Sequence, residues 1–154
     1  MSHASPRTAV VLAGGRGSRL APLTAVIPKP LVPVGDESIL EVLLKQLAHR
    51  GFERAMLSTG YLAHLIEAVI GDGKRTGIDV SYVREDRPLG TVGPLHLMAA
   101  DLPEHFLVLN GDVLTDLDFG AMLDEHIESD ATLTVATYPR RVAVTLGVID
   151  VDGQ

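Results

Sequence analysis

Short, wholly apolar runs alternate with segments of helical periodicity along most of this 154-residue chain. The runs have the length of strands, and the segments between them repeat apolar residues every three or four positions. Strands that are apolar at every position are buried on both faces, which is typical of parallel sheets covered by helices. We therefore expect an α/β fold, a Rossmann-like three-layer sandwich with a mostly parallel central sheet, in one domain over residues 1–154.

The boundaries of these elements can be estimated from the same pattern. Strands are expected at Thr8 to Leu12, Arg54 to Ser58, Asp79 to Val83 and Phe106 to Leu109, and further β-rich sequence at Ala131 to Tyr138 and Val144 to Val151. Helices are expected at Ser38 to Arg50, Ala63 to Ile70, Val92 to Ala100, and from a cap at Asp118 to Glu128. Ser38 and Glu41 have the spacing of a capping box, and Gly51 stands where a C-terminal cap belongs.

The composition argues against several classes of protein. With a formal net charge of −7, the chain is a poor general binder of nucleic acid. No apolar run approaches the ~20 residues of a membrane span, and the absence of cysteine excludes disulfides and thiolate metal sites. Because the N-terminus also lacks the apolar stretch of a signal peptide, we expect a cytoplasmic protein with neither a nucleic-acid nor a membrane partner.

The charges are distributed unevenly along the chain. The first 35 residues carry four basic and no acidic side chains, whereas the other 119 residues carry 9 basic and 20 acidic ones. A cationic start in an acidic protein favours a small anionic ligand near the N-terminus, with chance unevenness as the alternative.

Glycine is concentrated directly after the first expected strand, where Gly14, Gly15 and Gly17 fall within four positions. Such a loop lets the backbone approach a ligand and direct its N–H groups at phosphate oxygens. The spacing fits neither a P-loop nor a dinucleotide fingerprint, whose third glycine position is occupied by Leu20. The glycines alone fit a bare turn as well as a phosphate site.

Pro28-Lys29-Pro30 strengthens the case for phosphate. Proline fixes its own φ, and Pro30 predicts an extended conformation for Lys29, so the lysine is presented from a stiff backbone. Arg19 and Lys29 together could neutralise a polyphosphate. Further along, Asp112 follows an expected buried strand in Asn110-Gly111-Asp112, where a carboxylate can hold Mg²⁺ against phosphate oxygens. The alternative for Asp112 is a turn residue bonded to its own backbone.

The ordered series GGRGSRLAPLT (residues 14–24) followed by PKPLVPVG (residues 28–35) resembles the signature of the nucleoside-diphosphate-sugar pyrophosphorylases, the sugar-1-phosphate nucleotidyltransferases. The resemblance covers essentially the whole chain and is nearest to the mannose-1-phosphate guanylyltransferases. It implies catalytic roles for Arg19, Lys29 and Asp112, with Asp112 as the ligand of Mg²⁺. The nucleotide site that it implies comprises Leu12, Ala13, Gly14, Gly15, Arg19, Lys29, Glu85 and Gly90.

In this family, the residue five positions before the loop glycine faces the edge of the base, and here Glu85 precedes Gly90 by five. An ionised carboxylate only accepts hydrogen bonds. Guanine offers two adjacent donors, whereas uracil and thymine offer one donor between two acceptors, so Glu85 favours GTP. The alternative is a solvent-exposed loop carboxylate.

The resemblance thus implies transfer from GTP to mannose 1-phosphate or a related sugar 1-phosphate, with Gly147 near the sugar. Family members continue into a sugar-binding part, so the chain is expected to be the N-terminal, nucleotide-binding part of such a domain, with the C-terminal part missing. The alternatives are a uridylyl-, thymidylyl- or adenylyltransferase of the same family, a related transferase chemistry on the same loop, a catalytically silent nucleotide-binding or regulatory module, and a purely structural fragment. A homo-oligomer or a partner chain remains open.

Overall fold

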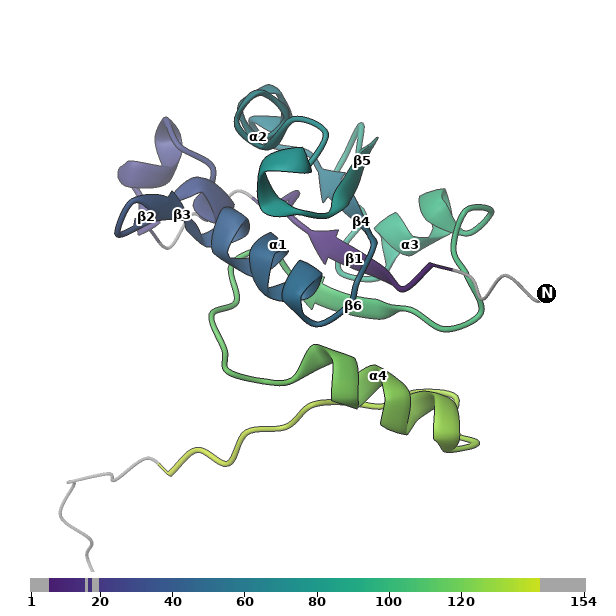
Figure 1. Cartoon of the computed structure of the whole chain (residues 1–154). Coiled ribbons are helices and arrows are strands. Elements are labelled where there is room, and N and C mark those ends of the chain that lie inside the picture. The colour runs from purple at the N-terminus through teal and green to yellow at the C-terminus, as the bar shows by residue number, and fades with distance from the viewer. Residues whose placement is uncertain (1–5, 16, 18–19, 142–154) are drawn as a thin grey trace, which may run out of the picture.

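A four-stranded parallel sheet forms the centre of the computed structural model, which describes residues 6–15, 17 and 20–141 (Figure 1). Its strands are β1 (Thr8–Leu12), β4 (Arg54–Thr59), β5 (Asp79–Arg84) and β6 (Leu107–Asn110). They lie in the order β5-β4-β1-β6, and every neighbouring pair is parallel. The four carboxyl ends therefore meet at one edge of the sheet, as the α/β prediction requires.

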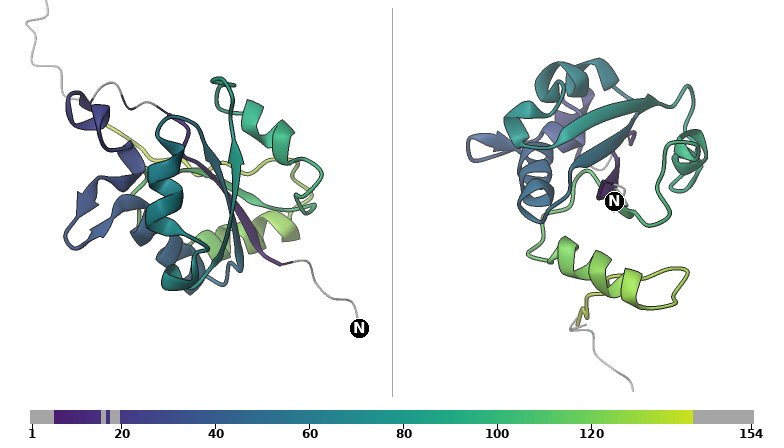
Figure 2. Two further views of the ribbon diagram at one scale, coloured as in Figure 1. Left: turned by 90° about the horizontal axis from the view of Figure 1, so that it is seen from above. Right: turned by 45° about the vertical axis from the view of Figure 1, so that its right-hand side comes forward.

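Helices cover both faces of this sheet (Figure 2). The larger apolar cluster joins strand residues such as Val11 and Leu57 to α1 (Ile39–His49), α2 (Ala63–Ile70) and α4 (Phe119–Glu128). A smaller cluster of Val10, Met56 and Met98 packs α3 (Gly93–Met98) on the opposite face. Neighbouring strand residues enter different clusters because successive side chains of a strand point to opposite faces. None of the described helices combines the length and apolarity needed to cross a bilayer.

Five short elements complete the described part of the chain. A two-stranded antiparallel hairpin joins β2 (Pro33–Val34) to β3 (Glu37–Ser38), directly before α1. Three single-turn 3-10 helices are η2 (Leu23–Ala25), η3 (Lys29–Leu31) and η4 (Lys74–Thr76).

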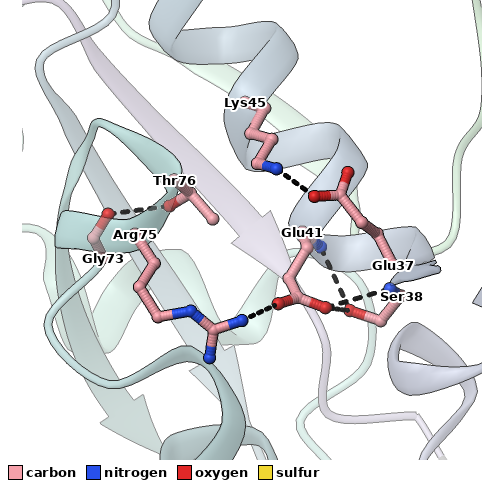
Figure 3. A network of polar contacts seen from close by, with 7 residues as sticks. All are labelled: Glu37, Ser38, Glu41, Lys45, Gly73, Arg75 and Thr76. Atoms are coloured by element: carbon pink, nitrogen blue, oxygen red, sulfur yellow. Dashed lines mark hydrogen bonds and ion pairs between the residues drawn. The ribbon is translucent and has the colours of Figure 1, made fainter.

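The predicted capping box begins α1 and also anchors a neighbouring loop (Figure 3). The backbone N–H of Glu41 donates to Ser38 Oγ over 3.2 Å, and the Ser38 N–H donates to Glu41 Oε2 over 3.0 Å. The other carboxylate oxygen, Oε1, accepts from Arg75 in η4 over 2.9 Å. The bond from the Ser38 backbone is the largest cause that holds the pKa of Glu41 below its ordinary value, followed by the opposing effect of burial. This network fixes η4 against the start of α1.

The predicted bounds of the elements hold closely from residue 8 to residue 128. Thr8–Leu12 and Ala63–Ile70 are reproduced without change, and Asp118 caps α4 by accepting from the Ala121 N–H over 3.0 Å. The third helix is shorter than expected and starts at Gly93, since Pro94 fits the first turn, where no N–H bond is needed. Gly51 follows α1 with a φ of +81°, as expected of a C-terminal cap.

The β-rich segment Ala131 to Tyr138 does not form a strand. No strand is present there, and Leu133, Val135 and Tyr138 are 77%, 66% and 87% exposed. A β-rich sequence forms a strand only when a neighbouring strand takes its N–H and C=O groups, and this segment meets none among the described residues. The β-rich stretch Val144 to Val151 lies outside the described residues.

The strand β6 is also less enclosed than its sequence indicated. It pairs with β1 alone within the described part of the chain, and Val108 is 41% exposed. The fully apolar run therefore forms an edge strand here, not a strand buried between two others.

Candidate functional site

A cavity of about 380 Å³ opens at the carboxyl edge of the sheet. It is lined by the loops that follow β1, β5 and β6, together with the start of η3. Eight predicted site residues line it: Leu12, Ala13, Gly14, Gly15, Lys29, Glu85, Gly90 and Asp112. Arg19 and Gly147, also predicted, lie outside the described residues. The other lining residues were not predicted: Gly17, Pro30, Pro88, Thr91, Pro94 and Asn110.

The glycine-rich loop is fixed at its base by the neighbouring strands. The Ala13 N–H donates to the Ser58 carbonyl over 2.8 Å, and the Gly111 N–H donates to the Leu12 carbonyl over 2.9 Å. A Cβ at Gly14 would lie 2.5 Å from Glu85 Oε1, whereas a Cβ at Gly15 would meet no atom within 4 Å. A side chain at position 14 would therefore collide with Glu85, whereas the cavity has open space beside Gly15.

The next part of the loop folds back towards Lys29. Gly17 has a φ of +60°, and its carbonyl accepts from the buried Thr24 hydroxyl over 2.9 Å. A Cβ at Gly17 would lie 3.1 Å from the Lys29 Cβ. Thr24 is therefore an anchor of the loop that the motif contained but to which sequence reasoning gave no role. The sequence signal for this role is a hydroxyl residue between apolar neighbours, because a buried hydroxyl must find a hydrogen-bond acceptor.

Lys29 reaches the cavity from a helical turn, so the predicted extended conformation is wrong. The Leu31 N–H donates to the Pro28 carbonyl over 2.8 Å, and the Val32 N–H donates to the Lys29 carbonyl over 3.1 Å. These bonds close η3, and Pro30 occupies its first turn, where its missing N–H costs nothing. The lysine still stands on a restrained backbone, as expected.

The ammonium group of Lys29 forms an ion pair with Asp112 Oδ2 across 83 positions of sequence. About a third of the Lys29 side chain and a quarter of the Asp112 side chain are exposed, so the pair lies in the wall of the cavity and not beneath it. The Asp112 carboxylate therefore has a cation as its partner. Within the described residues 20–141 it is not bonded to its own backbone, as the alternative interpretation of a turn residue would require. Asp118, by contrast, caps α4 and pairs with Arg50 over 2.6 Å.

The Glu85 carboxylate is held at both oxygens. Ser58 Oγ donates to Oε1 over 2.7 Å, and the Leu89 N–H donates to Oε2 over 3.1 Å. The Glu85 backbone N–H also donates to the Thr59 carbonyl over 2.8 Å, which continues the ladder between β4 and β5. Sequence reasoning missed Ser58 because no local motif marks it. Only the register of β4 on β5 brings its side chain to Glu85.

Comparison with known proteins identifies the family to which the chain belongs. A family model described as "Nucleotidyl transferase" matches residues 8–154. A mannose-1-phosphate guanylyltransferase of Mycobacterium tuberculosis is 41% identical over 82% of the chain and 36% of its own length. A UTP--glucose-1-phosphate uridylyltransferase of Synechocystis is 34% identical over 94% of the chain and 41% of its own length.

A solved structure of HddC from Yersinia pseudotuberculosis, complexed with GMP-PN, has a TM-score of 0.71 and 31% identity. It covers 80% of the chain, which in turn covers 56% of that structure. The chain spans 36%, 41% and 61% of the lengths of three curated relatives. Sequence, fold and the cavity at the carboxyl edge agree, and the chain belongs to the nucleotidyl transferase family.

Proposed function

We propose that this chain forms the nucleotide-binding part of a sugar-1-phosphate nucleotidyltransferase that joins GTP and mannose 1-phosphate, or a related sugar 1-phosphate, to give GDP-sugar and pyrophosphate. One observation carries the proposal: loops far apart in sequence bring open glycine backbone, a lysine and two carboxylates into a single cavity. The relatives support the reaction class, since the names of two of them state transfer to a sugar 1-phosphate.

The base selection rests on Glu85, because relatives named for guanylyl and uridylyl transfer both resemble the chain. Ser58 and the Leu89 N–H each donate to a different oxygen of this carboxylate. A carboxylate oxygen accepts two hydrogen bonds, so each oxygen retains one place for a ligand. Two adjacent acceptors match the N1–H and the exocyclic amine of guanine, and they match neither uracil nor thymine.

The proposed reaction is an in-line displacement. An oxygen of the sugar phosphate attacks the α-phosphorus of GTP, and the bond from that phosphorus to the bridging oxygen of the β-phosphate breaks. Pyrophosphate leaves with the electron pair. Lys29, with Arg19 as the sequence predicts, stabilises the charge that accumulates on the pyrophosphate, where a fixed cation contributes more than it does in the bound substrate.

The residues at the cavity fit a magnesium ion that arrives with the nucleotide. Among the described residues no group of three or more histidine, aspartate, glutamate or cysteine side chains gathers, and Asp112 alone supplies the carboxylate beside Lys29. Mg²⁺ is commonly bound by one or two carboxylates together with substrate phosphates and water. When bound, it would offset phosphate charge, and Asp112 would hold it.

Binding of Mg²⁺ and phosphate at this place requires the ion pair between Lys29 and Asp112 to open. Lys29 would then be free to bind a phosphate oxygen, and the Asp112 carboxylate would be free to hold the metal ion. The pair keeps two opposite charges compensated while no ligand is present, at a modest cost because both side chains are partly exposed.

Calorimetric titration of the chain with GTP, UTP, dTTP and ATP, each with Mg²⁺, tests the proposal. We expect GTP to bind most tightly, and pyrophosphate release on addition of mannose 1-phosphate to report turnover. Preference for UTP or dTTP would overturn the proposed selection of guanine but would not affect the proposed reaction class. Binding of GTP without turnover would support a nucleotide-binding module, and the absence of any binding would contradict the nucleotide site.

A further inference from the structure

We infer that Ser58 is a positioning residue for base selection: its buried hydroxyl holds the Glu85 carboxylate in the orientation that discriminates between guanine and the pyrimidines uracil and thymine. The inference rests on the proposed function, because it assigns the residue that makes Glu85 selective. Ser58 itself does not line the cavity.

The position of Ser58 is fixed by the sheet. It lies near the carboxyl end of β4, opposite Val83 of β5, and no part of it is exposed to solvent. Its carbonyl accepts from the Ala13 N–H over 2.8 Å, while its hydroxyl donates to Glu85 Oε1 over 2.7 Å. One residue therefore joins the base of the glycine-rich loop to the carboxylate that faces the cavity.

Glu85 needs such a partner because it follows the last residue of β5, where the chain leaves the sheet. Beyond Glu85, the loop holds the exposed residues Asp86, Arg87 and Pro88 before it returns at Leu89. The described bonds to the carboxylate come from Ser58 on the sheet and from the Leu89 N–H on the loop. The serine bond is the only one of the two that ties the carboxylate to the rigid sheet.

The close approach of Gly14 sets the direction of the carboxylate. A Cβ at Gly14 would lie 2.5 Å from Oε1 and 3.4 Å from the carboxyl carbon, so the backbone of the glycine-rich loop packs directly against Glu85. The bond from Ser58 and the close backbone of Gly14 therefore both restrict the positions that Oε1 can take. Loss of the hydroxyl would release the carboxylate to turn towards solvent, since a free side chain regains its rotamer freedom.

Substitution of Ser58 by alanine has a matched control in the neighbouring strand. Ser81 of β5 also carries a buried hydroxyl, and that hydroxyl has no hydrogen-bond partner among the described residues. Ser58→Ala and Ser81→Ala therefore remove the same atom from the same sheet, but only the first removes a bond to Glu85.

The first measurement is titration of both variants with GTP, ITP and UTP in the presence of Mg²⁺. Because hydrogen bonds to charged groups are among the stronger ones, we expect Ser58→Ala to weaken GTP binding by about tenfold. ITP lacks the exocyclic amine, so its affinity should fall less than that of GTP in Ser58→Ala. The affinity for UTP should change by less than about twofold. Ser81→Ala should retain the ratio of GTP to UTP affinity. A wild-type ratio in Ser58→Ala would overturn the inference.

The second measurement needs no ligand. The Leu89 N–H donates to the other oxygen of Glu85, so its hydrogen exchange reports whether the carboxylate stays in place. We expect faster exchange at Leu89 in Ser58→Ala and an unchanged rate in Ser81→Ala. Equal rates in both variants would contradict the positioning role. If the unaltered chain fails to prefer GTP, the proposed base selection is wrong, and the exchange measurement still decides what holds Glu85.

Discussion

Two glutamates of this protein are each held by a serine, at the start of α1 and at the end of β5. Glu41 accepts from Ser38, and its remaining oxygen accepts from Arg75, a cation (Figure 3). Glu85 accepts from Ser58 and from a backbone N–H, and no ion pair to it occurs within the described part of the chain. The same pairing of residue types thus produces a charge compensated within the fold in one case and a charge directed at a cavity in the other.

The ion pair of Lys29 with Asp112 lies between these two cases. Its charges compensate each other, as at Glu41, but the pair borders the cavity, as Glu85 does. What distinguishes a structural carboxylate from one available to a ligand is therefore the nature of its partner and the open space beside it. Substitutions that exchange charge for a neutral group of the same shape can test this distinction.

Glu85→Gln is expected to have the largest effect. The amide replaces one acceptor by a donor, which then faces a donor of guanine. By the strength of hydrogen bonds to charged groups, GTP affinity should fall about 10- to 100-fold, while UTP affinity is retained or improved. Calorimetric titration measures both. Glu41→Gln, which lies outside the cavity, should leave both affinities unchanged, and an equal loss of GTP and UTP in Glu85→Gln would refute base selection by Glu85.

Much of this arrangement could be predicted from sequence, because local signals determine it. The capping box at Ser38 and Glu41 and the apolar runs of the parallel strands define elements whose positions follow from residue types alone. Ligands of parallel sheets bind at the carboxyl ends of the strands, which points to the loops that begin at Ala13, Arg84 and Asn110, and the cavity lies there. Seven of the eight predicted site residues at the cavity belong to β1 or to these loops, and Lys29 comes from η3; the family resemblance, and not this rule about strand ends, implied all eight.

What the sequence could not provide depends on tertiary context. Ser58 reaches Glu85 only through the register of β4 on β5, over 27 positions. Lys29 adopts a helical turn because the bonds that close η3, one of them to its own carbonyl, outweigh the effect of one following proline. The short hairpin before α1 has strands of only two residues, too few to show alternation. The β-rich segment at Ala131 to Tyr138 has the composition of a strand and no partner among the described residues.

Gly14→Ala should have the next largest effect, because its new Cβ would lie 2.5 Å from Glu85 Oε1. Forcing the carboxylate and the loop apart should lower the free energy of unfolding by about 1–3 kcal/mol, the usual cost of overpacking. It should also weaken GTP binding by about tenfold through displacement of one charged hydrogen-bond acceptor. Urea unfolding and titration measure the two effects.

Gly15→Ala is the control for this substitution. A Cβ at Gly15 would meet no atom within 4 Å, and Gly15 is not among the glycines with a positive φ. The free energy of unfolding of Gly15→Ala should stay within about 0.5 kcal/mol of that of the unaltered chain. Equal stabilities of the two variants would contradict the close contact between Gly14 and Glu85.

Asp112→Asn should have a smaller effect, and one of opposite sign. Without its carboxylate partner Lys29 is free to bind phosphate, and a negative charge that repels the triphosphate is removed. In the presence of EDTA we therefore expect GTP to bind about three- to tenfold more tightly than to the unaltered chain, in the range of partly exposed ion pairs. Added Mg²⁺ should then improve binding less than it does in the unaltered chain.

Asp118→Asn provides the comparison for Asp112→Asn. Asp118 also pairs with a basic residue, Arg50, but it caps α4, and asparagine is an equally good cap. The GTP affinity of Asp118→Asn should equal that of the unaltered chain, both with and without Mg²⁺. Weaker binding of metal-free GTP to Asp112→Asn would show that the pair with Lys29 does not compete with phosphate.

Glu41→Gln should have the smallest effect, on stability alone. Glutamine can keep the shape of the capping box but not its charge, so the loss combines a weaker bond from the Ser38 N–H with the loss of the ion pair to the exposed Arg75, about 1 kcal/mol at pH 7. The pKa of Glu41 lies below its ordinary value of 4.5 in the folded chain, so its charge stabilises the fold fully above that pH. The stabilisation is lost as the pH falls through the folded pKa.

The difference in unfolding free energy between the unaltered chain and Glu41→Gln should therefore be constant near neutral pH and shrink below pH 4.5. Urea unfolding at a series of pH values measures it. Arg75→Ala removes the same ion pair from the other side and should reproduce only the ion-pair part of the neutral-pH loss, because the bonds between Ser38 and the charged Glu41 remain. A difference that persists at acid pH would mean that the shape of the Glu41 side chain, and not its charge, holds η4 on α1, and the contrast with Glu85 would then rest on packing.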